Sequence, residues 1–295
     1  MASGQPSGAM DDQRLNLSAG LASVAVALLL VGLKLWALAA TGALSVAASL
    51  TDSGLDLIAS MAGLAGIAYA ARPPDEDHSF GHSSAEDLVA LGQALLVTAS
   101  AAVIGWAAVG RLGEPPVLTE AGIGLVVMAA SVVVTAGLVA WQGRVARRTG
   151  SKIVAADRLH YLSDMLPAIG AMLALVASSR FGVGWVDPAV ALAACLMLVT
   201  GAGRIGVSAW NALMDRAAEP ALIAEVERIV GSYPGVRGFH DLRTRTSGDR
   251  VFVQVHLELD GDQSLRAAHA ISAGVRRALL GTIRNADVII HQDPV

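Results

Sequence analysis

Six long apolar stretches limit what this chain can fold into. They run approximately over residues 15–40, 43–71, 86–112, 117–142, 153–180 and 188–213. Each exceeds the ~20 residues that a helix needs to cross ~30 Å of hydrocarbon. The pattern therefore predicts an α-helical membrane protein with six transmembrane helices.

The overall composition agrees with a membrane protein. Only 16% of the residues are charged and 54% are apolar, whereas a soluble chain carries about 25% charged residues. The net charge of −4 gives no indication of nucleic-acid binding. A single cysteine, Cys195, excludes an internal disulfide and thiolate-based motifs. Residues 1–14 are polar and short, and no cleavable signal peptide is expected.

The distribution of cationic side chains predicts the orientation. By the positive-inside rule the ends richer in Lys and Arg face the cytoplasm, so both termini are expected there, with residues 1–14 as a cytoplasmic tail and 15–213 as the six-helix transmembrane domain. Lys34, near the outer end of the first span, is expected to snorkel to the interface. The inner ends carry Arg14, Arg72, Arg144, Arg147, Arg148 and Lys152, and the outer ends carry Lys34, Arg111 and Arg180.

Two pairs of polar residues lie inside the apolar stretches. Asp52 and Asp56 form one pair, and His160 and Asp164 form the other, each four residues apart. On a helix this spacing puts both side chains on one face, with Cβ atoms about 5–6 Å apart. A charge at the bilayer centre costs at least ~2.5–3.5 kcal/mol, so such residues usually mark an ion pathway. Three carboxylates and one imidazole can also coordinate a divalent cation.

The chain changes character near residue 214, and residues 214–295 are expected to form a small α+β cytoplasmic domain. Residues 251–259 alternate strictly, which is typical of a half-buried strand. A turn at residues 247–249 joins this strand to an earlier one near residues 240–246. With a helix before residue 231, another at 264–280 and a last strand at 287–291, the order αββαβ predicts a ferredoxin-like two-layer domain.

The other histidines lie outside the apolar stretches. Asp75, His78 and His82 share one polar loop, and their spacing permits them to converge on one ion. The remaining four, His240, His256, His269 and His291, belong to the C-terminal domain, where Asp293 follows closely. The alternative for both groups is an ordinary solvated surface. For the intramembrane set it is structural hydrogen bonding between helices, which Ser or Thr would provide at lower cost.

Several segments of the sequence resemble the cation diffusion facilitator family, and within it the bacterial ferrous-iron and zinc efflux pumps. The resemblance covers nearly the whole chain from Leu15 to Pro294. Relatives often carry a basic residue where this chain has Ser84, so a charge pair from this position, for example with Asp215, is not expected. The segments that carry the resemblance are residues 51–56, 78–82, 159–164, 234–245 and 288–294.

The resemblance implies a homodimer of six-helix protomers in the bacterial inner membrane, with paired cytoplasmic domains. It also implies three metal sites. The transport site would be Asp52, Asp56, His160 and Asp164, and the loop site would be Asp75, His78 and His82. The C-terminal binuclear site would be His240, His256, His269, His291 and Asp293, with Asp293 as a candidate bridging carboxylate.

These ligands bind a metal only when deprotonated, so cation binding displaces protons. We therefore expect proton-coupled antiport of zinc by alternating access, with Cd²⁺, Fe²⁺ and Mn²⁺ as further candidate ions. One alternative is a transporter dedicated to iron or manganese, and another is a metal-sensing membrane protein without flux. An intramembrane metallohydrolase is disfavoured, because four protein ligands leave no open water position; the chain is not expected to be an enzyme.

Overall fold

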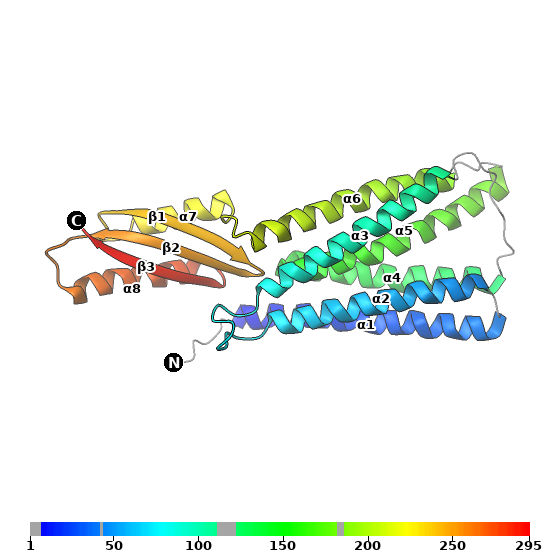
Figure 1. Cartoon of the computed structure of the whole chain (residues 1–295), viewed down its shortest axis with the longest axis horizontal. Helices are drawn as coiled ribbons and strands as arrows, with labels where there is room; N and C mark the ends of the chain where they lie inside the picture. The colour runs from blue at the N-terminus through cyan, green and yellow to red at the C-terminus, as the bar shows by residue number, and fades with distance from the viewer. Residues whose placement is uncertain (1–6, 42–43, 111–121, 182–185) are drawn as a thin grey trace. The chain divides into compact units, whose positions relative to one another are not determined.

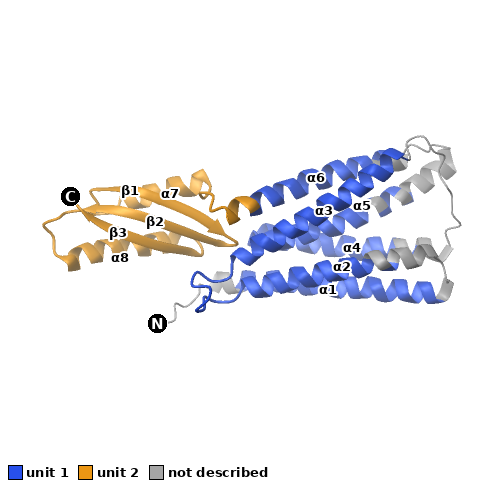
Figure 2. Cartoon of the chain, in the orientation of Figure 1, with its two compact units in different colours: residues 1–209 blue, residues 210–295 orange. Residues whose placement is uncertain are grey.

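The computed structural model describes residues 7–41, 44–110, 122–181 and 186–295 of the chain. These residues separate into two compact units, 1–209 and 210–295, which Figure 2 shows in two colours.

The N-terminal unit consists of long helices, labelled in Figure 1. Five of them contain described segments long and apolar enough to cross a membrane. The other one, α5, carries the His160 and Asp164 pair and further charged residues, which lower its mean hydropathy. The prediction of a helical transmembrane domain is confirmed, with five to six candidate spans. The helices are α1 (Ser7–Thr41), α2 (Leu44–Ala70), α3 (Ser84–Gly110), α4 (Gly122–Thr149), α5 (Lys152–Phe181) and α6 (Val186–Leu213).

Helix α5 has many neighbours in this unit, because it contacts α3, α4, α2 and α1. Small residues let helices approach closely in lipid. At Gly66 of α2, an added Cβ would lie 2.7 Å from Cγ2 of Val89 on α3. Helix α6 packs through Leu198 and Ala202 against Val97 of α3. The polar residues of α5 therefore face other helices at several points.

The C-terminal unit has the predicted order αββαβ. Its elements are α7 (Pro220–Gly231), β1 (Gly238–Ser247), β2 (Arg250–Leu259), α8 (Leu265–Thr282) and β3 (Ala286–Pro294). The sheet order is β1-β2-β3, with β1 and β2 antiparallel and β2 and β3 parallel. Gly248, with a φ of 55°, lies in the predicted hairpin turn, where a left-handed backbone favours glycine.

The core of this unit lies between the sheet and its two helices. Val253, Val255 and Leu257 of β2 are at most 1% exposed, as the alternating pattern predicts, and they pack with Val275 and Leu279 of α8. The opposite face of β2 is polar except at one position. Phe252 on that face is 8% exposed, and the guanidinium of Arg245 on β1 lies 4.0 Å from the centre of its ring.

Candidate metal centres

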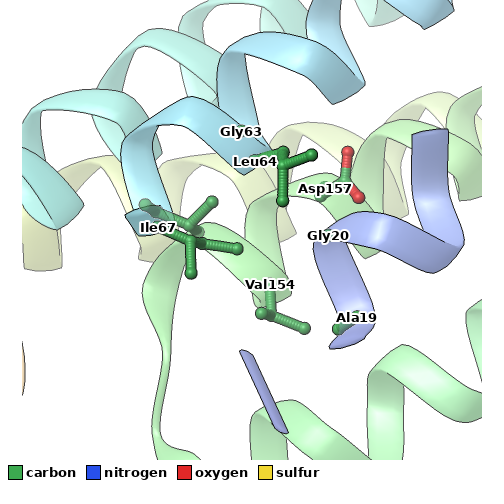
Figure 3. A pocket seen from close by; sticks show the side chains of 8 residues that line it. Ala19, Gly20, Gly63, Leu64, Ile67, Val154 and Asp157 are labelled. Carbon is green, nitrogen blue, oxygen red and sulfur yellow. The ribbon is translucent and has the colours of Figure 1, made fainter. Parts of the chain in front are cut away.

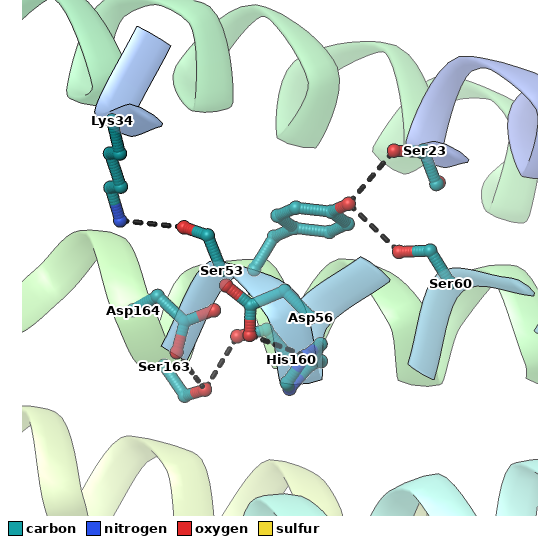
Figure 4. A network of polar contacts seen from close by, with 9 residues as sticks. Ser23, Lys34, Ser53, Asp56, Ser60, His160, Ser163 and Asp164 are labelled. Carbon is teal, nitrogen blue, oxygen red and sulfur yellow. Dashed lines mark hydrogen bonds and ion pairs between the residues drawn. The ribbon is translucent and has the colours of Figure 1, made fainter. Parts of the chain in front are cut away.

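The intramembrane polar residues of α2 and α5 meet at one place, which Figure 4 shows. Asp56, His160 and Asp164 each offer a ligand atom, and these atoms lie within 4.8 Å of one another. Nε2 of His160 is 3.3 Å from Oδ1 of Asp56. The structure thus brings together three of the four residues predicted for the transport site. The fourth, Asp52, belongs to α2 one turn before Asp56, but its side chain lies outside the described residues.

The His160 imidazole is prepared for a further ligand. The residue is 5% exposed, and its Nδ1 has no hydrogen-bond partner among the described residues, whereas its Nε2 faces the Asp56 carboxylate at 3.3 Å. A buried polar group without a partner is costly. Ser163 Oγ donates a hydrogen bond of 2.5 Å to the backbone carbonyl of His160, and it lies 3.3 Å from Oδ1 of Asp164. A divalent cation bound between these side chains would contact the imidazole together with the carboxylates of Asp56 and Asp164.

Lys34 makes a hydrogen bond that was not predicted. Its Nζ donates over 2.6 Å to Oγ of Ser53 on α2 (Figure 4). Ser53 lies three residues before Asp56 and is 1% exposed. The ammonium group is therefore held at the helix that carries the carboxylates of the candidate transport site.

The loop residues Asp75, His78 and His82 also offer ligand atoms within 4.8 Å of one another. Nε2 of His82 lies 3.3 Å from one carboxylate oxygen of Asp75, and Nδ1 of His78 lies 3.4 Å from the other. The backbone N–H of His78 donates to Oδ1 of Asp75 over 2.7 Å, and this hydrogen bond is the main reason that the pKa of the Asp75 carboxyl is lowered. His82 is buried, whereas Asp75 and His78 are exposed, so the loop is open to solvent on one side.

The strand register of the C-terminal unit aligns three histidines. His240 on β1 pairs with His256 on β2, and His256 pairs with His291 on β3. Asp293 lies among them, because its Oδ2 is 2.9 Å from Nδ1 of His256 and 3.3 Å from Nε2 of His240, while its Oδ1 is 3.3 Å from Nε2 of His291. The two oxygens of Asp293 thus face different imidazoles, which suits a carboxylate that bridges two ions.

The predicted C-terminal set differs from the observed cluster in three residues. His269 lies exposed on α8 and belongs to none of the candidate ligand groups that the described residues form. Asp241 joins His240 and His256 in a group that was not predicted, and Oε1 of Glu258 lies 3.3 Å from Nδ1 of His240. Asp241 directly follows a histidine and Glu258 follows His256 on the same face of β2. These were signals that sequence reasoning could have used.

One buried carboxylate of the N-terminal unit was also missed. Asp157 on α5 is 5% exposed and lies three residues before His160. Its Oδ2 accepts hydrogen bonds from Oγ of Ser23 on α1 at 2.5 Å and from Nε2 of Gln142 on α4 at 2.6 Å. The spacing from His160 was visible in the sequence, but the partners come from distant helices.

The fold and the sites define a multi-pass membrane protein with a candidate cation site between its helices and further candidate metal ligands in its C-terminal domain. Comparison with known proteins gives the same result. Residues 20–214 match the cation efflux transmembrane domain, and residues 218–295 match the cytoplasmic domain of cation efflux proteins. The chain belongs to the cation efflux family. It is a divalent-metal efflux transporter and not an enzyme.

The curated relatives span almost the whole chain. The cation-efflux pump FieF of Escherichia coli O127:H6 is 40% identical over 281 residues, which cover 95% of this chain and 93% of that protein. FieF of Klebsiella pneumoniae subsp. pneumoniae has the same identity and coverage. Among solved structures, a nickel form of the MamM C-terminal domain is 24% identical, covers 26% of this chain and 99% of its own, and has a TM-score of 0.25. The metal-bound C-terminal domain of CzcD from Thermotoga maritima is 27% identical, covers 25% of this chain and 87% of its own, and has a TM-score of 0.24.

Proposed function

We propose that this protein exports zinc from the cytoplasm in exchange for protons, through a transport site of Asp52, Asp56, His160 and Asp164. The observation that carries the proposal is the convergence of Asp56, His160 and Asp164 between long apolar helices, with their ligand atoms within 4.8 Å of one another. Such polar groups inside a membrane usually mark an ion pathway. With Asp52 they would form a four-coordinate site for a divalent cation.

Proton exchange follows from the chemistry of the ligands. Carboxylates and imidazole must lose their protons before they bind a metal, so loading of zinc releases protons and protonation favours release of zinc. An unperturbed imidazole titrates near pH ~6.5, within the physiological range. A site that opens to the cytoplasm would load zinc, and the same site open to the outside would release it as protons return.

The orientation in the membrane follows from the cationic residues. The ends that carry most Lys and Arg, including Arg144, Arg147 and Arg148, would face the cytoplasm together with both termini. Full-length similarity to FieF supports a place in the bacterial inner membrane. The match of residues 218–295 to the cytoplasmic domain of cation efflux proteins supports a homodimer in which these domains pair.

The two other sites would regulate transport from the cytoplasmic side. The loop site is formed by Asp75, His78 and His82, and the C-terminal site by His240, His256, His291 and Asp293, with His269 as a further candidate ligand. The geometry of Asp293 between three imidazoles suits bound zinc, because both carboxylate oxygens and several ring nitrogens face one space. Bound metal would also neutralise acidic groups in this region.

Zinc is the proposed ion because a tetrahedral set of carboxylates and imidazole suits it. The three oxygen donors would also accept Cd²⁺, Fe²⁺ or Mn²⁺, since geometry and cellular availability decide selectivity among these ions. Competition among the four ions in one transport assay would establish their order.

Flux measurements in proteoliposomes test the proposal. Asp164→Ala should abolish zinc flux while the protein remains folded and dimeric, because the change removes a ligand and a proton carrier together. Asp262→Asn, which changes an exposed carboxylate of the C-terminal unit, is the control and should leave flux unchanged. A protonophore should collapse uptake into everted vesicles. Wild-type flux in Asp164→Ala would refute the transport site, and zinc binding without flux in the unmodified protein would indicate a sensor.

A further inference from the structure

Asp157 is a buried carboxylate that the proposed transport site does not use. Its Oδ2 accepts the hydrogen bonds from Ser23 and Gln142, whereas its Oδ1 is buried without a hydrogen-bond partner among the described residues. Among the described residues, no Lys or Arg nitrogen forms an ion pair with Asp157. The neighbouring Arg158 turns away, and its Nε donates to the backbone carbonyl of Val139 on α4 over 3.3 Å. An ionised carboxylate in such a place is costly unless other charges compensate it.

The surroundings of Asp157 are otherwise apolar. It lines a narrow crevice between α1, α2 and α5, which Figure 3 shows from close by. Two glycines keep the helices close here: a Cβ added at Gly20 would lie 3.0 Å from Cδ1 of Leu64. A Cβ added at Gly63 would lie 3.0 Å from Nε2 of Gln93.

The same region is connected to the cation site. Asp157 and His160 are three residues apart on α5, a spacing that puts helical side chains about 5–6 Å from each other at Cβ. The hydroxyl of Tyr161 donates to the backbone carbonyl of Ser23 at 2.9 Å and lies 2.8 Å from Oγ of Ser60, one turn beyond Asp56 on α2. A charge on Asp157 and a charge at the cation site therefore interact strongly, because the distance between them is short and the protein interior has a low dielectric constant.

The groups around Asp157 determine how it responds to a cation. From α1 and α4 it meets only the neutral Ser23 and Gln142. The titratable groups that act on it electrostatically are His160 from its own helix and Asp56 from α2, and Tyr161 lies in the same hydrogen-bond network. A divalent cation at the candidate transport site would add two positive charges to this set. An added positive charge favours the ionised form of a carboxyl group.

We infer that Asp157 is a proton-exchange site coupled to the transport site, protonated when that site is empty and ionised when a divalent cation occupies it. On cation binding, the O–H bond of the carboxyl group breaks and its proton passes to water. The hydroxyl of Ser23 and the amide of Gln142 then stabilise the carboxylate that remains. When the cation leaves, a proton returns. This inference rests on the proposed function, and it adds one proton to those that the ligands themselves release.

The test counts the protons released per zinc bound by the full-length protein in detergent. Titration calorimetry in buffers of different ionisation enthalpy gives this number. The variants are built on a background with His82→Ala and His256→Ala, which weakens the two other sites. Asp157→Asn keeps the shape of the neutral carboxyl group but has no proton to release. We expect it to bind zinc with about one proton fewer per site than the background protein.

Two further variants control the experiment. Asp12→Asn changes a different buried carboxylate, which lies on α1 about 16 Å along the helix from Ser23. This variant should leave the proton count unchanged. Ser23→Ala removes a donor to the ionised form, so its proton release should shift to higher pH. An unchanged count in Asp157→Asn with zinc still bound would overturn the inference. If that variant does not fold, an unchanged pH profile in Ser23→Ala overturns it. Failure of the background protein to bind zinc would instead refute the transport site.

Discussion

Nζ of Lys152 lies 2.5 Å from Oδ1 of Asp87, and this ion pair joins the first turn of α5 to the first turn of α3. The backbone N–H of Lys152 also donates to Oε1 of Glu86 over 2.9 Å. Asp87 is fully buried, and the Lys152 side chain is 20% exposed. The pair therefore fixes the start of the helix that carries the candidate transport residues.

The Lys152–Asp87 ion pair predicts that the effects of two substitutions on thermal stability are not additive. Asp87→Asn and Lys152→Gln should each lower the thermal stability of the full-length protein, because each leaves one partner without its counter-charge. Breaking a fully buried pair costs ~3–5 kcal/mol, and the partial exposure of Lys152 places this one below that range. The double variant should be more stable than the sum of the single effects predicts. Strict additivity in thermal denaturation would show that the two charges do not interact.

The C-terminal domain, expressed as residues 216–295, should be stabilised by zinc. His240, His256, His291 and Asp293 crowd polar groups together, and a bound cation would hold them. At a zinc concentration a hundredfold above Kd the gain is about 2.7 kcal/mol per site, seen as a higher melting temperature. His291→Ala combined with Asp293→Ala should remove this shift, whereas Asp262→Asn should keep it.

The same double substitution has a distinct expected effect in the full-length protein. Transport should slow but continue if, as proposed, the C-terminal site regulates the pump and does not conduct the ion. Complete loss of flux in proteoliposomes, with the protein folded, would contradict that division of roles.

The packing of α8 against Tyr233 predicts opposite effects for two glycine substitutions. A Cβ added at Gly274 would lie 1.9 Å from the hydroxyl oxygen of Tyr233, so Gly274→Ala should destabilise the domain by about 1–3 kcal/mol. Gly281 is on the same helix with nothing within 4 Å of such a Cβ, so Gly281→Ala should be neutral or stabilise by up to about 1 kcal/mol. Urea denaturation of the isolated domain measures both changes.

An ion pair on helix α7 should make the stability of the C-terminal unit depend on pH. The guanidinium of Arg228 donates hydrogen bonds of 2.8 and 2.6 Å to the carboxylate of Glu225, and these bonds lower the pKa of Glu225. A folded-state pKa below the unfolded value stabilises the fold above the unfolded pKa, and this contribution is lost as the pH falls through the folded pKa. Arg228→Gln should raise the pKa of Glu225 in an NMR titration. The loss of stability at acidic pH that is due to Glu225 should then become smaller. An unchanged titration would show that the ion pair does not persist in solution.

Much of the fold was predictable because it depends on local patterns. The length of the apolar stretches predicted the long helices, and the alternation of residues 251–259 predicted which face of β2 is buried. The burial of Phe252 was not predicted, because it depends on how the side chain of Arg245, its partner across the predicted hairpin, packs over the ring.

The candidate sites show the same division. The four-residue spacing within α2 and α5 indicated Asp56, His160 and Asp164, because residues one turn apart share a helix face. Asp157 was missed although it lies on the same helix. Its hydrogen-bond partners Ser23 and Gln142 lie 134 and 15 residues away in the sequence. Its Oδ1 is buried and has no hydrogen-bond partner among the described residues, which the sequence does not show either.

The row of histidines across β1, β2 and β3 has a mechanical consequence. Strand β3 is an edge strand of this sheet. It pairs with β2 alone, and the two strands are parallel. A cation held by His256, His291 and Asp293 would tie that terminal strand to its neighbour through side chains as well as backbone. Bound zinc would then hold β3 to β2, and the amide hydrogens of β3 should exchange with solvent more slowly as the zinc concentration rises.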